Sequence, residues 1–193
     1  MLTIFDELLW AIIGLLLTIS GVFIEVAIPL PTEWPIDWKQ IDIHSLGVTL
    51  QVGAVLLVSC LGGKNAGALS QIAYLVLGLS GMQVFSQGGG LSYLKEPTFG
   101  YLLGFLPGAW ICGYLAFRKQ RRIEVLLLSC LCGLLAIHLM GVIYLTGLSL
   151  FQRSSMSWGA SIWQYSLLPL PGQLIVICAV AVIAYLLRQV LFY

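Results

Sequence analysis

The amino-acid sequence predicts an all-α integral membrane protein, in which residues 1–193 form a single domain built as a six-helix transmembrane bundle. Of the 193 residues, 60% are hydrophobic and only 9% are charged, whereas a typical soluble domain carries about 25% charged residues. The mean hydropathy is +1.00, and apolar runs recur at about the 20 residues that a helix needs to cross a bilayer. So few charges cannot cover a water-facing surface, which indicates a membrane protein.

The first apolar run covers residues 8–28, and Glu25 interrupts it close to its end. A cleaved signal peptide is the competing interpretation. Asp6 and Glu7 precede the run without any Lys or Arg, which argues against that alternative. The predicted helices after the first span residues 46–62, 66–85, 98–117, 123–150 and 170–192. These helices leave little of the chain for a soluble domain.

Lysine and arginine side chains predict the orientation, because they concentrate in the cytoplasmic loops of membrane proteins. The sequence RKQRR at 118–122 joins the fourth and fifth predicted helices. Of the nine basic residues, six fall on this side of the bundle. Both termini are therefore predicted to be cytoplasmic, and the protein to be multi-pass in the cell inner (plasma) membrane. The six are Lys64, Arg118, Lys119, Arg121, Arg122 and Arg188, and the remaining three are Lys39, Lys95 and Arg153.

The predicted outer side is rich in aromatic, proline and glycine residues. Its tryptophans form either an ordinary interfacial belt or part of a lid over a binding site. Residues 86–98, named here the glycine loop, contain three consecutive glycines. Glycine allows positive φ and a close approach of backbone to a ligand, so this loop is either a generic turn or part of a site. The tryptophans in question are Trp34, Trp38, Trp158 and Trp163.

Small residues recur at helical spacing in two of the predicted helices, where they allow close helix packing. The stripe in the fourth helix is expected to pack inside the bundle. The stripe in the first helix predicts a close-contact face that lies either inside the bundle or against a partner protein. The two stripes are Gly100, Gly104 and Gly108 in the fourth helix, and Ala11, Gly14 and Thr18 in the first.

The cysteines lie within apolar runs, and the sequence has no C-x-x-C motif. They are therefore expected to be small buried residues. A thiol redox centre is the alternative, indicated only by the sequence CLC at 130–132. The two histidines, His44 and His138, are too few and too far apart in the sequence to predict a metal site with them. We therefore expect no metal and no cofactor. A net charge of +1 gives no reason to expect nucleic-acid binding. The cysteines are Cys60, Cys112, Cys130, Cys132 and Cys178.

Short motifs follow one another in a specific order between Thr49 and Phe117. Their order and spacing resemble the BioY family, the biotin-binding S components of energy-coupling-factor (ECF) vitamin transporters. The sequence PLPG at 169–172 is similar to a motif before the last helix of that family, and the six predicted helices agree with its fold. The matching residues are Thr49-Leu50-Gln51, Gly67-Ala68-Leu69, Tyr74 to Gly78, Gly81, Val84-Phe85, Gly90-Leu91, Leu94, Pro97-Thr98, Gly100-Tyr101 and Gly104-Phe105.

The resemblance implies a transport subunit rather than an enzyme. It places biotin, or a similar small molecule, at the outer face beneath the loops between helices 1 and 2, 3 and 4, and 5 and 6. It also implies that the first helix docks on an ECF transmembrane coupling protein, with partner ATPases supplying the energy. The chain itself has no G-x-x-x-x-G-K-[ST] phosphate-binding motif. Candidate substrate-binding residues are Gln51, Gln87, Gly88, Gly89, Gly90, Tyr93, Lys95, Thr98, Tyr101 and Gln173, and candidate docking residues are Ala11, Gly14 and Thr18.

Three positions depart from the family pattern. Gly88 stands where the glycine loop usually carries a basic residue, and Gln173 and Val176 stand where an acidic residue and a lysine are usual. Neutral donors and acceptors, or Lys95, are expected to take over their interactions with the ligand.

Three alternatives to biotin uptake stay open. The same fold could bind a less charged ligand, or the chain could be a structural or assembly subunit of a larger membrane complex. An enzyme built around the membrane-embedded His138 is the third. For His138 itself, a hydrogen bond to a neighbouring helix is the default expectation.

Overall fold

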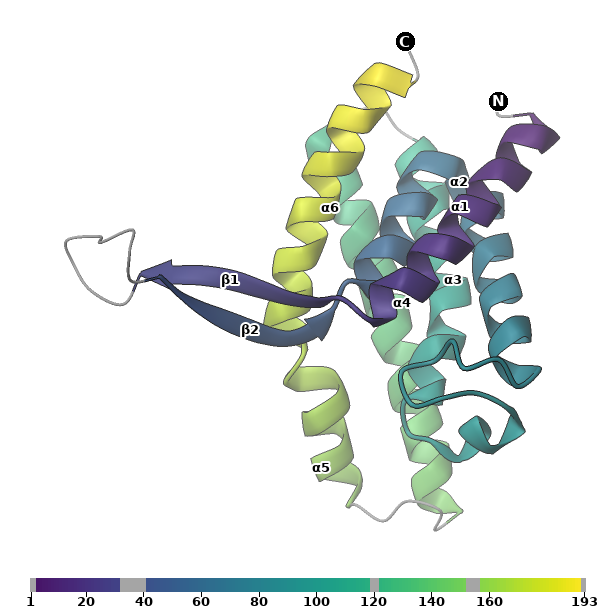
Figure 1. The fold of residues 1–193 in the computed structure, drawn as a ribbon, viewed down its shortest axis with the longest axis vertical. Helices are drawn as coiled ribbons and strands as arrows, with labels where there is room; N and C mark the ends of the chain where they lie inside the picture. The colour runs from purple at the N-terminus through teal and green to yellow at the C-terminus, as the bar shows by residue number, and fades with distance from the viewer. Residues whose placement is uncertain (1–2, 32–40, 119–121, 152–156, 192–193) are drawn as a thin grey trace.

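The computed structural model describes residues 3–31, 41–118, 122–151 and 157–191, which form a helical bundle with a projecting two-stranded hairpin (Figure 1). Trp34, Trp38 and the basic residues at positions 39, 119, 121 and 153 lie outside the described residues. The elements in chain order are α1 (Ile4–Val22), β1 (Glu25–Pro31), β2 (Ile41–Thr49), α2 (Gln51–Leu79), η1 (Leu91–Lys95), α3 (Phe99–Arg118), α4 (Ile123–Leu150), α5 (Trp158–Ile162), η2 (Trp163–Leu167) and α6 (Leu170–Leu191).

Helix α2 folds back on itself at Gly63. Gly63 has φ 79° and ψ −177°, a conformation that is essentially restricted to glycine. The side chain of Gln51 donates a hydrogen bond of 2.8 Å to the hydroxyl of Tyr74, although 23 residues of straight helix would separate them by about 35 Å. Residues 51–62 and 64–79 are therefore two antiparallel arms.

These arms occupy the positions of the second and third predicted helices, but the predicted count of six is not confirmed. In the part of the chain that the structure describes, five helices are long and apolar enough to cross a membrane. The first arm, 51–62, would be about 18 Å long at 1.5 Å per residue, which is shorter than the ~30 Å hydrocarbon core. The two arms thus count as one long apolar helix with a reversal in it.

The hairpin of β1 and β2 was not predicted and corrects the ends of two expected helices. Helix α1 ends at Val22 rather than continuing to residue 28, and α2 begins at Gln51 rather than at 46. The strands pair antiparallel, with Ile28 opposite His44. Prolines at 29 and 31 exclude a helical continuation of the apolar run, because proline lacks an amide N–H and clashes with the preceding turn. Where β2 ends, Val48 lies against Gly172 at the start of α6.

The glycine stripe of α3 packs against α4, as predicted for an internal stripe. A Cβ atom added to Gly104 would lie 2.7 Å from the carbonyl oxygen of Ile137, and one added to Gly100 would lie 2.2 Å from Cβ of Tyr144. Only glycine lets the two helices approach this closely. Further along α3, a Cβ on Gly113 would lie 2.5 Å from the backbone nitrogen of Lys64, so α3 also covers the reversal in α2.

The small-residue face of α1 lies inside the bundle, against α2. Ala11 and Thr18 are buried, and a Cβ added to Gly14 would lie 2.7 Å from a methyl group of Val58. Of the two alternatives for this face, the structure shows intramolecular packing, so these three residues present no free surface to a partner. The opposite face of α1 is apolar and exposed, and it includes Ile4, Leu8, Ile12 and Leu16.

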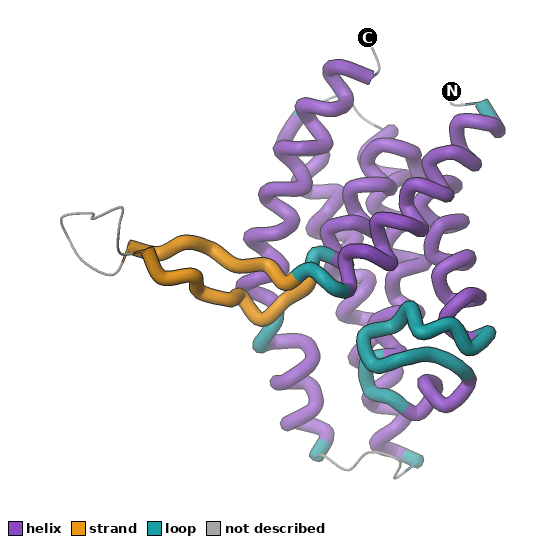
Figure 2. The backbone as a smooth tube through the Cα atoms, viewed as in Figure 1, coloured by secondary structure: helices purple, strands orange, loops and turns teal. Residues whose placement is uncertain are grey.

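The two ends of the bundle differ in character. Both termini, the C-terminal end of α3 and the N-terminal end of α4 lie together at one end (Figure 1), where Arg118 and Arg122 are found. The glycine loop and α5 lie at the opposite end, and the loop is irregular apart from η1 (Figure 2). This separation agrees with the predicted grouping of basic residues. The end with the glycine loop is called the loop end below.

Replacing Gly63 tests the reversal in α2. We expect Gly63→Ala to destabilise the protein by about 1–3 kcal/mol, because a side chain strains this backbone conformation. The measurement is thermal unfolding of the purified protein in detergent. Gly147→Ala in α4 is the control, since a Cβ there would meet no atom within 4 Å and alanine favours a helix. Equal midpoints for the two variants would refute the strained reversal.

Candidate functional site

Five of the ten predicted substrate-binding residues belong to three hydrogen-bonded groups at the loop end. The first group connects the start of α2 with Val84, just before the glycine loop. Gln51 donates to the Tyr74 hydroxyl at 2.8 Å, and that hydroxyl donates to the carbonyl oxygen of Val84 at 3.0 Å. Both side chains are buried. Gln51 is thereby held in place by Tyr74, a residue that the sequence motif contained but that was not predicted as part of the site.

The glycine loop uses its three glycines for its own fold. Gly88 and Gly90 have φ of 115° and 91°, as expected from a loop that requires positive φ. Gly88 and Phe85 exchange two backbone hydrogen bonds, and the Gly90 amide donates to the Gly78 carbonyl at 2.7 Å. A Cβ on Gly89 would lie 2.1 Å from the carbonyl oxygen of Met82. The loop is therefore pinned to the end of α2, while the space beside the Cα of Gly88 is open.

The second group is centred on Tyr93 in η1. Its hydroxyl lies 3.1 Å from the hydroxyl oxygens of both Ser86 and Thr98, and its ring is buried. The ring also belongs to a chain of aromatic contacts from the second arm of α2 to α4, with centroid separations of 4.7–6.3 Å. These contacting rings form a continuous aromatic layer at the loop end, which is called the aromatic floor below. Its members are Tyr74, Phe85, Tyr93, Phe99 and Tyr144.

The third group joins α3, α4, η2 and α6. The Tyr101 hydroxyl lies 2.5 Å from the Ser166 hydroxyl, and the Tyr101 ring stands edge-on to the His138 ring at 5.7 Å. The His138 Nε2 atom lies 2.7 Å from the Gln173 Oε1 atom. The default expectation for His138, a hydrogen bond to a neighbouring helix, is thus confirmed. His138 also brings together two predicted site residues, Tyr101 and Gln173, which the sequence could not connect.

The remaining predicted residues are placed differently. Gln87 and Lys95 are exposed on the glycine loop, whereas Thr98 of the second group is half-buried. Val176, at a position where a lysine was expected from the resemblance, is buried, and its methyl group would lie 2.7 Å from a Cβ added to Gly53. This valine therefore packs α6 against α2, and its role is apolar. The described hydrogen bonds of the three groups involve uncharged side chains and backbone atoms.

Comparison with known proteins identifies a matching family. The model of the BioY family matches residues 3–192. An uncharacterised 21.2 kDa protein of Cyanophora paradoxa is 31% identical over 184 residues, which cover 95% of each chain. A protein of Lysinibacillus sphaericus named as a probable biotin transporter, BioY, is 35% identical over 144 residues, covering 74% of this chain and 66% of that protein.

Two further similarities extend the comparison. A biotin transporter, BioY, of Thermotoga maritima is 38% identical over 109 residues, covering 56% of this chain and 64% of that protein. The fold is similar to the crystal structure of an S-component for biotin from an ECF-type ABC transporter, with a TM-score of 0.69 over 98% of this chain and 95% of that one. The sequence identity to that structure is 20%, so this likeness supports the fold alone.

Removing one hydroxyl tests the first hydrogen-bonded group. Tyr74→Phe leaves the buried Gln51 amide and Val84 carbonyl without this partner, and we expect a loss of about 1–3 kcal/mol in stability. Thermal unfolding in detergent measures the change. Tyr114→Phe is the matched control, because Tyr114 is exposed on the part of α3 remote from the loop end. If Tyr74→Phe unfolds at the same temperature as the control, the Tyr74 hydroxyl does not stabilise the link between Gln51 and Val84.

Proposed function

The chain belongs to the BioY family, and on that premise we propose that it is the substrate-binding membrane subunit of a biotin uptake system. The observation that carries the proposal is the match of the family over residues 3–192, together with relatives named as biotin transporters. The chain is a multi-pass membrane protein and a transport protein rather than an enzyme.

We place the biotin site at the loop end, among the three hydrogen-bonded groups. Biotin has a ureido group that needs hydrogen-bond donors and acceptors, an apolar bicyclic ring system and a carboxylate. Amide and hydroxyl side chains supply hydrogen bonds for the ureido group, and the aromatic floor supplies contacts for the ring system. The exposed Lys95 ammonium is suited to pair with the carboxylate. The proposed contacts are Gln51, Gln87, Gly88, Gly89, Gly90, Tyr93, Lys95, Thr98, Tyr101 and Gln173.

His138 has a positioning role in this proposal. When its Nε2 atom carries the proton, it donates to the Gln173 Oε1 atom across their 2.7 Å contact. The Gln173 side-chain NH₂ group, which is a donor only, is then turned toward the remaining space. Gln173 is half-buried, so this NH₂ group is suited to donate to the carbonyl oxygen of a ureido group. A neutral amide held in this way takes the place of the acidic residue usual at this position.

We further propose that partner proteins supply the energy for transport. The resemblance of the motifs between Thr49 and Phe117 to S components of ECF transporters favours a transmembrane coupling protein and ATPases as partners. Because the small-residue face of α1 is buried, its exposed apolar face, with Leu8, Ile12 and Leu16, is the surface available for docking. The grouping of the basic residues at the end with both termini favours cytoplasmic termini, and with them an outward-facing loop end in the cell inner membrane.

Calorimetric titration with biotin tests the function. We expect the purified protein to bind biotin, and Gln173→Leu to weaken binding by about fivefold to a hundredfold, because leaving a polar group of the bound ligand without its partner costs about 1–3 kcal/mol. Tyr114→Phe, remote from the loop end, is expected to bind as the natural chain does. No heat and no protection from thermal unfolding at millimolar biotin would overturn the proposal.

A second candidate function is suggested by the neutral residues at three positions that are usually charged. Gly88, Gln173 and Val176 would favour a less charged small molecule bound in the same fold. Mass spectrometry of small molecules that copurify with the protein separates this candidate from biotin. Recovery of ATPases after mild detergent extraction would in turn exclude a purely structural subunit.

A further inference from the structure

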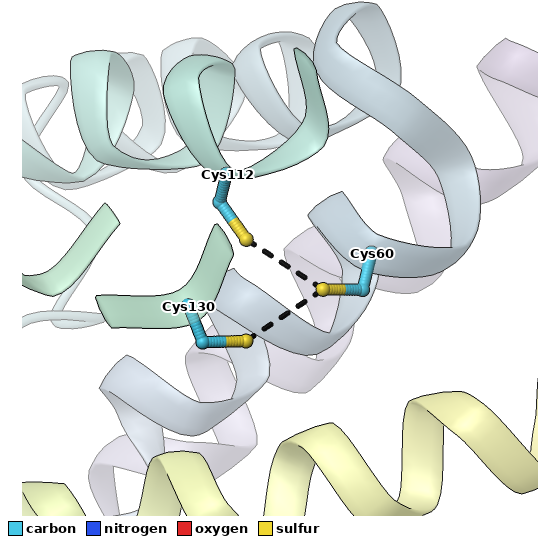
Figure 3. A group of neighbouring side chains, drawn as sticks. All are labelled: Cys60, Cys112 and Cys130. Carbon is cyan, nitrogen blue, oxygen red and sulfur yellow. Dashed lines mark hydrogen bonds between the residues drawn. The ribbon is translucent and has the colours of Figure 1, made fainter. Parts of the chain in front are cut away.

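Three cysteine side chains from three different helices meet in the bundle core. The Cys60 sulfur, on the first arm of α2, lies 3.6 Å from the Cys112 sulfur on α3 and 3.7 Å from the Cys130 sulfur on α4 (Figure 3). All three sulfur atoms lie within 4.8 Å of one another, and all three residues are completely buried. They are 52 and 70 positions from Cys60 in the chain, so tertiary packing alone creates this thiol cluster.

Close helix packing brings the sulfurs together. A Cβ added to Gly133 would lie 3.0 Å from Cβ of Cys112, and one added to Gly108 would lie 2.9 Å from the Gly133 carbonyl oxygen. The backbones of α3 and α4 therefore nearly touch beside the cluster. Cys60 lies just before the reversal at Gly63, so the first arm of α2 presents its sulfur to both helices. The positions of the sulfurs are set by contacts that leave little freedom.

The cluster holds reduced thiols rather than a disulfide. A disulfide bond brings two sulfurs to about 2.05 Å, and the observed separations are 3.6 and 3.7 Å. Three thiols at this distance interact only weakly with one another, because the thiol group is a poor hydrogen-bond donor. The same three sulfurs are strong ligands for a soft metal ion once they lose their protons.

The geometry selects among such ions. Three thiolates bound in a trigonal plane at about 2.3 Å from a central metal lie about 4.0 Å apart, close to the spacing in the cluster. Structural zinc sites require four protein ligands, and within the described residues no fourth cysteine, histidine or carboxylate joins this group. Soft thiolates also select monovalent copper. We propose that Cys60, Cys112 and Cys130 form a trigonal binding site for Cu(I).

The surroundings offer partial charge compensation. Each thiol that binds the ion releases its proton, so one Cu(I) and three thiolates together carry two net negative charges. Arg188 on α6 is buried and donates a hydrogen bond of 2.9 Å to the Ala116 carbonyl, one turn beyond Cys112. Its guanidinium brings a permanent positive charge to the end of α3 that carries Cys112, which compensates part of the negative charge.

A bound ion would link α2, α3 and α4 near the end of the bundle that holds the termini. This role is separate from the biotin site, because no residue of the cluster belongs to the three hydrogen-bonded groups. The sequence predicted five small buried cysteines and no metal. Three of the five cysteines are buried as expected, and the proposed copper site departs from the expectation of no metal. Cys132, the second cysteine of the CLC sequence, is only half-buried, and Cys178 is exposed. Both lie outside the cluster, which makes them matched controls.

Anaerobic titration of the reduced, detergent-purified protein with Cu(I), in competition with the chelator bicinchoninate, tests the site. We expect one Cu(I) per chain, an affinity at least a hundredfold lower in Cys60→Ser, and no change in Cys132→Ser or Cys178→Ser. Cu(I) should also raise the unfolding temperature of the natural chain and leave that of Cys60→Ser unchanged. Equal binding by the natural chain and Cys60→Ser, or binding that depends on Cys132 or Cys178, would overturn the proposal.

X-ray absorption of the copper-loaded natural chain gives a second test that needs no variant to fold. Three sulfur neighbours at a single short distance support the trigonal site, whereas two sulfurs or any nitrogen or oxygen neighbour contradicts it. Because neither experiment uses biotin, its outcome does not depend on the proposed transport function. A chain that binds biotin and no Cu(I) would refute this inference alone.

Discussion

Close contact between helix backbones at glycine is the constraint on which the rest of this structure depends. Inside a membrane the lipid is as apolar as the side chains, so helices associate through tight packing and polar contacts rather than through the hydrophobic effect. Gly104 lies directly against the Ile137 carbonyl, and Gly113 lies against the backbone where α2 reverses. These contacts hold α3 between α4 and the two arms of α2. The loop end and the thiol cluster are both built on this arrangement.

The loop end depends on this frame and adds a second constraint, the satisfaction of buried polar groups. Polar atoms removed from water must find partners, and here the partners come from distant segments. The Tyr74 hydroxyl is hydrogen-bonded to the Gln51 amide and to the Val84 carbonyl, and the His138 ring is hydrogen-bonded to Gln173. The result is a set of neutral side chains with restricted orientations, as a site for a small polar molecule requires. Charged positions expected from the family have been replaced by an amide, a glycine and a buried valine.

The opposite half of the bundle uses the same frame for different chemistry. Where α3 and α4 come together at Gly108 and Gly133, the reversal of α2 adds a third sulfur to two others. The thiol cluster and the loop end are therefore both products of helix proximity. The loop end brings together oxygen and nitrogen atoms that are suited to a vitamin-sized ligand. The thiol cluster brings together sulfur atoms that are suited to a soft cation.

Local chemistry in the chain was enough to predict the membrane class, most helix positions, the break between the apolar runs 46–62 and 66–85, and the positive φ of the glycine loop, because hydropathy and glycine act over short range. It did not predict the hairpin. Prolines at 29 and 31 argue against a helix in this segment, but only pairing with residues 41–49 makes residues 25–31 a strand. The meeting of His138 with Gln173, and of Cys60 with Cys112 and Cys130, depended on how helices rotate and pack. Such contacts join residues far apart in the chain, and only the folded arrangement decides them.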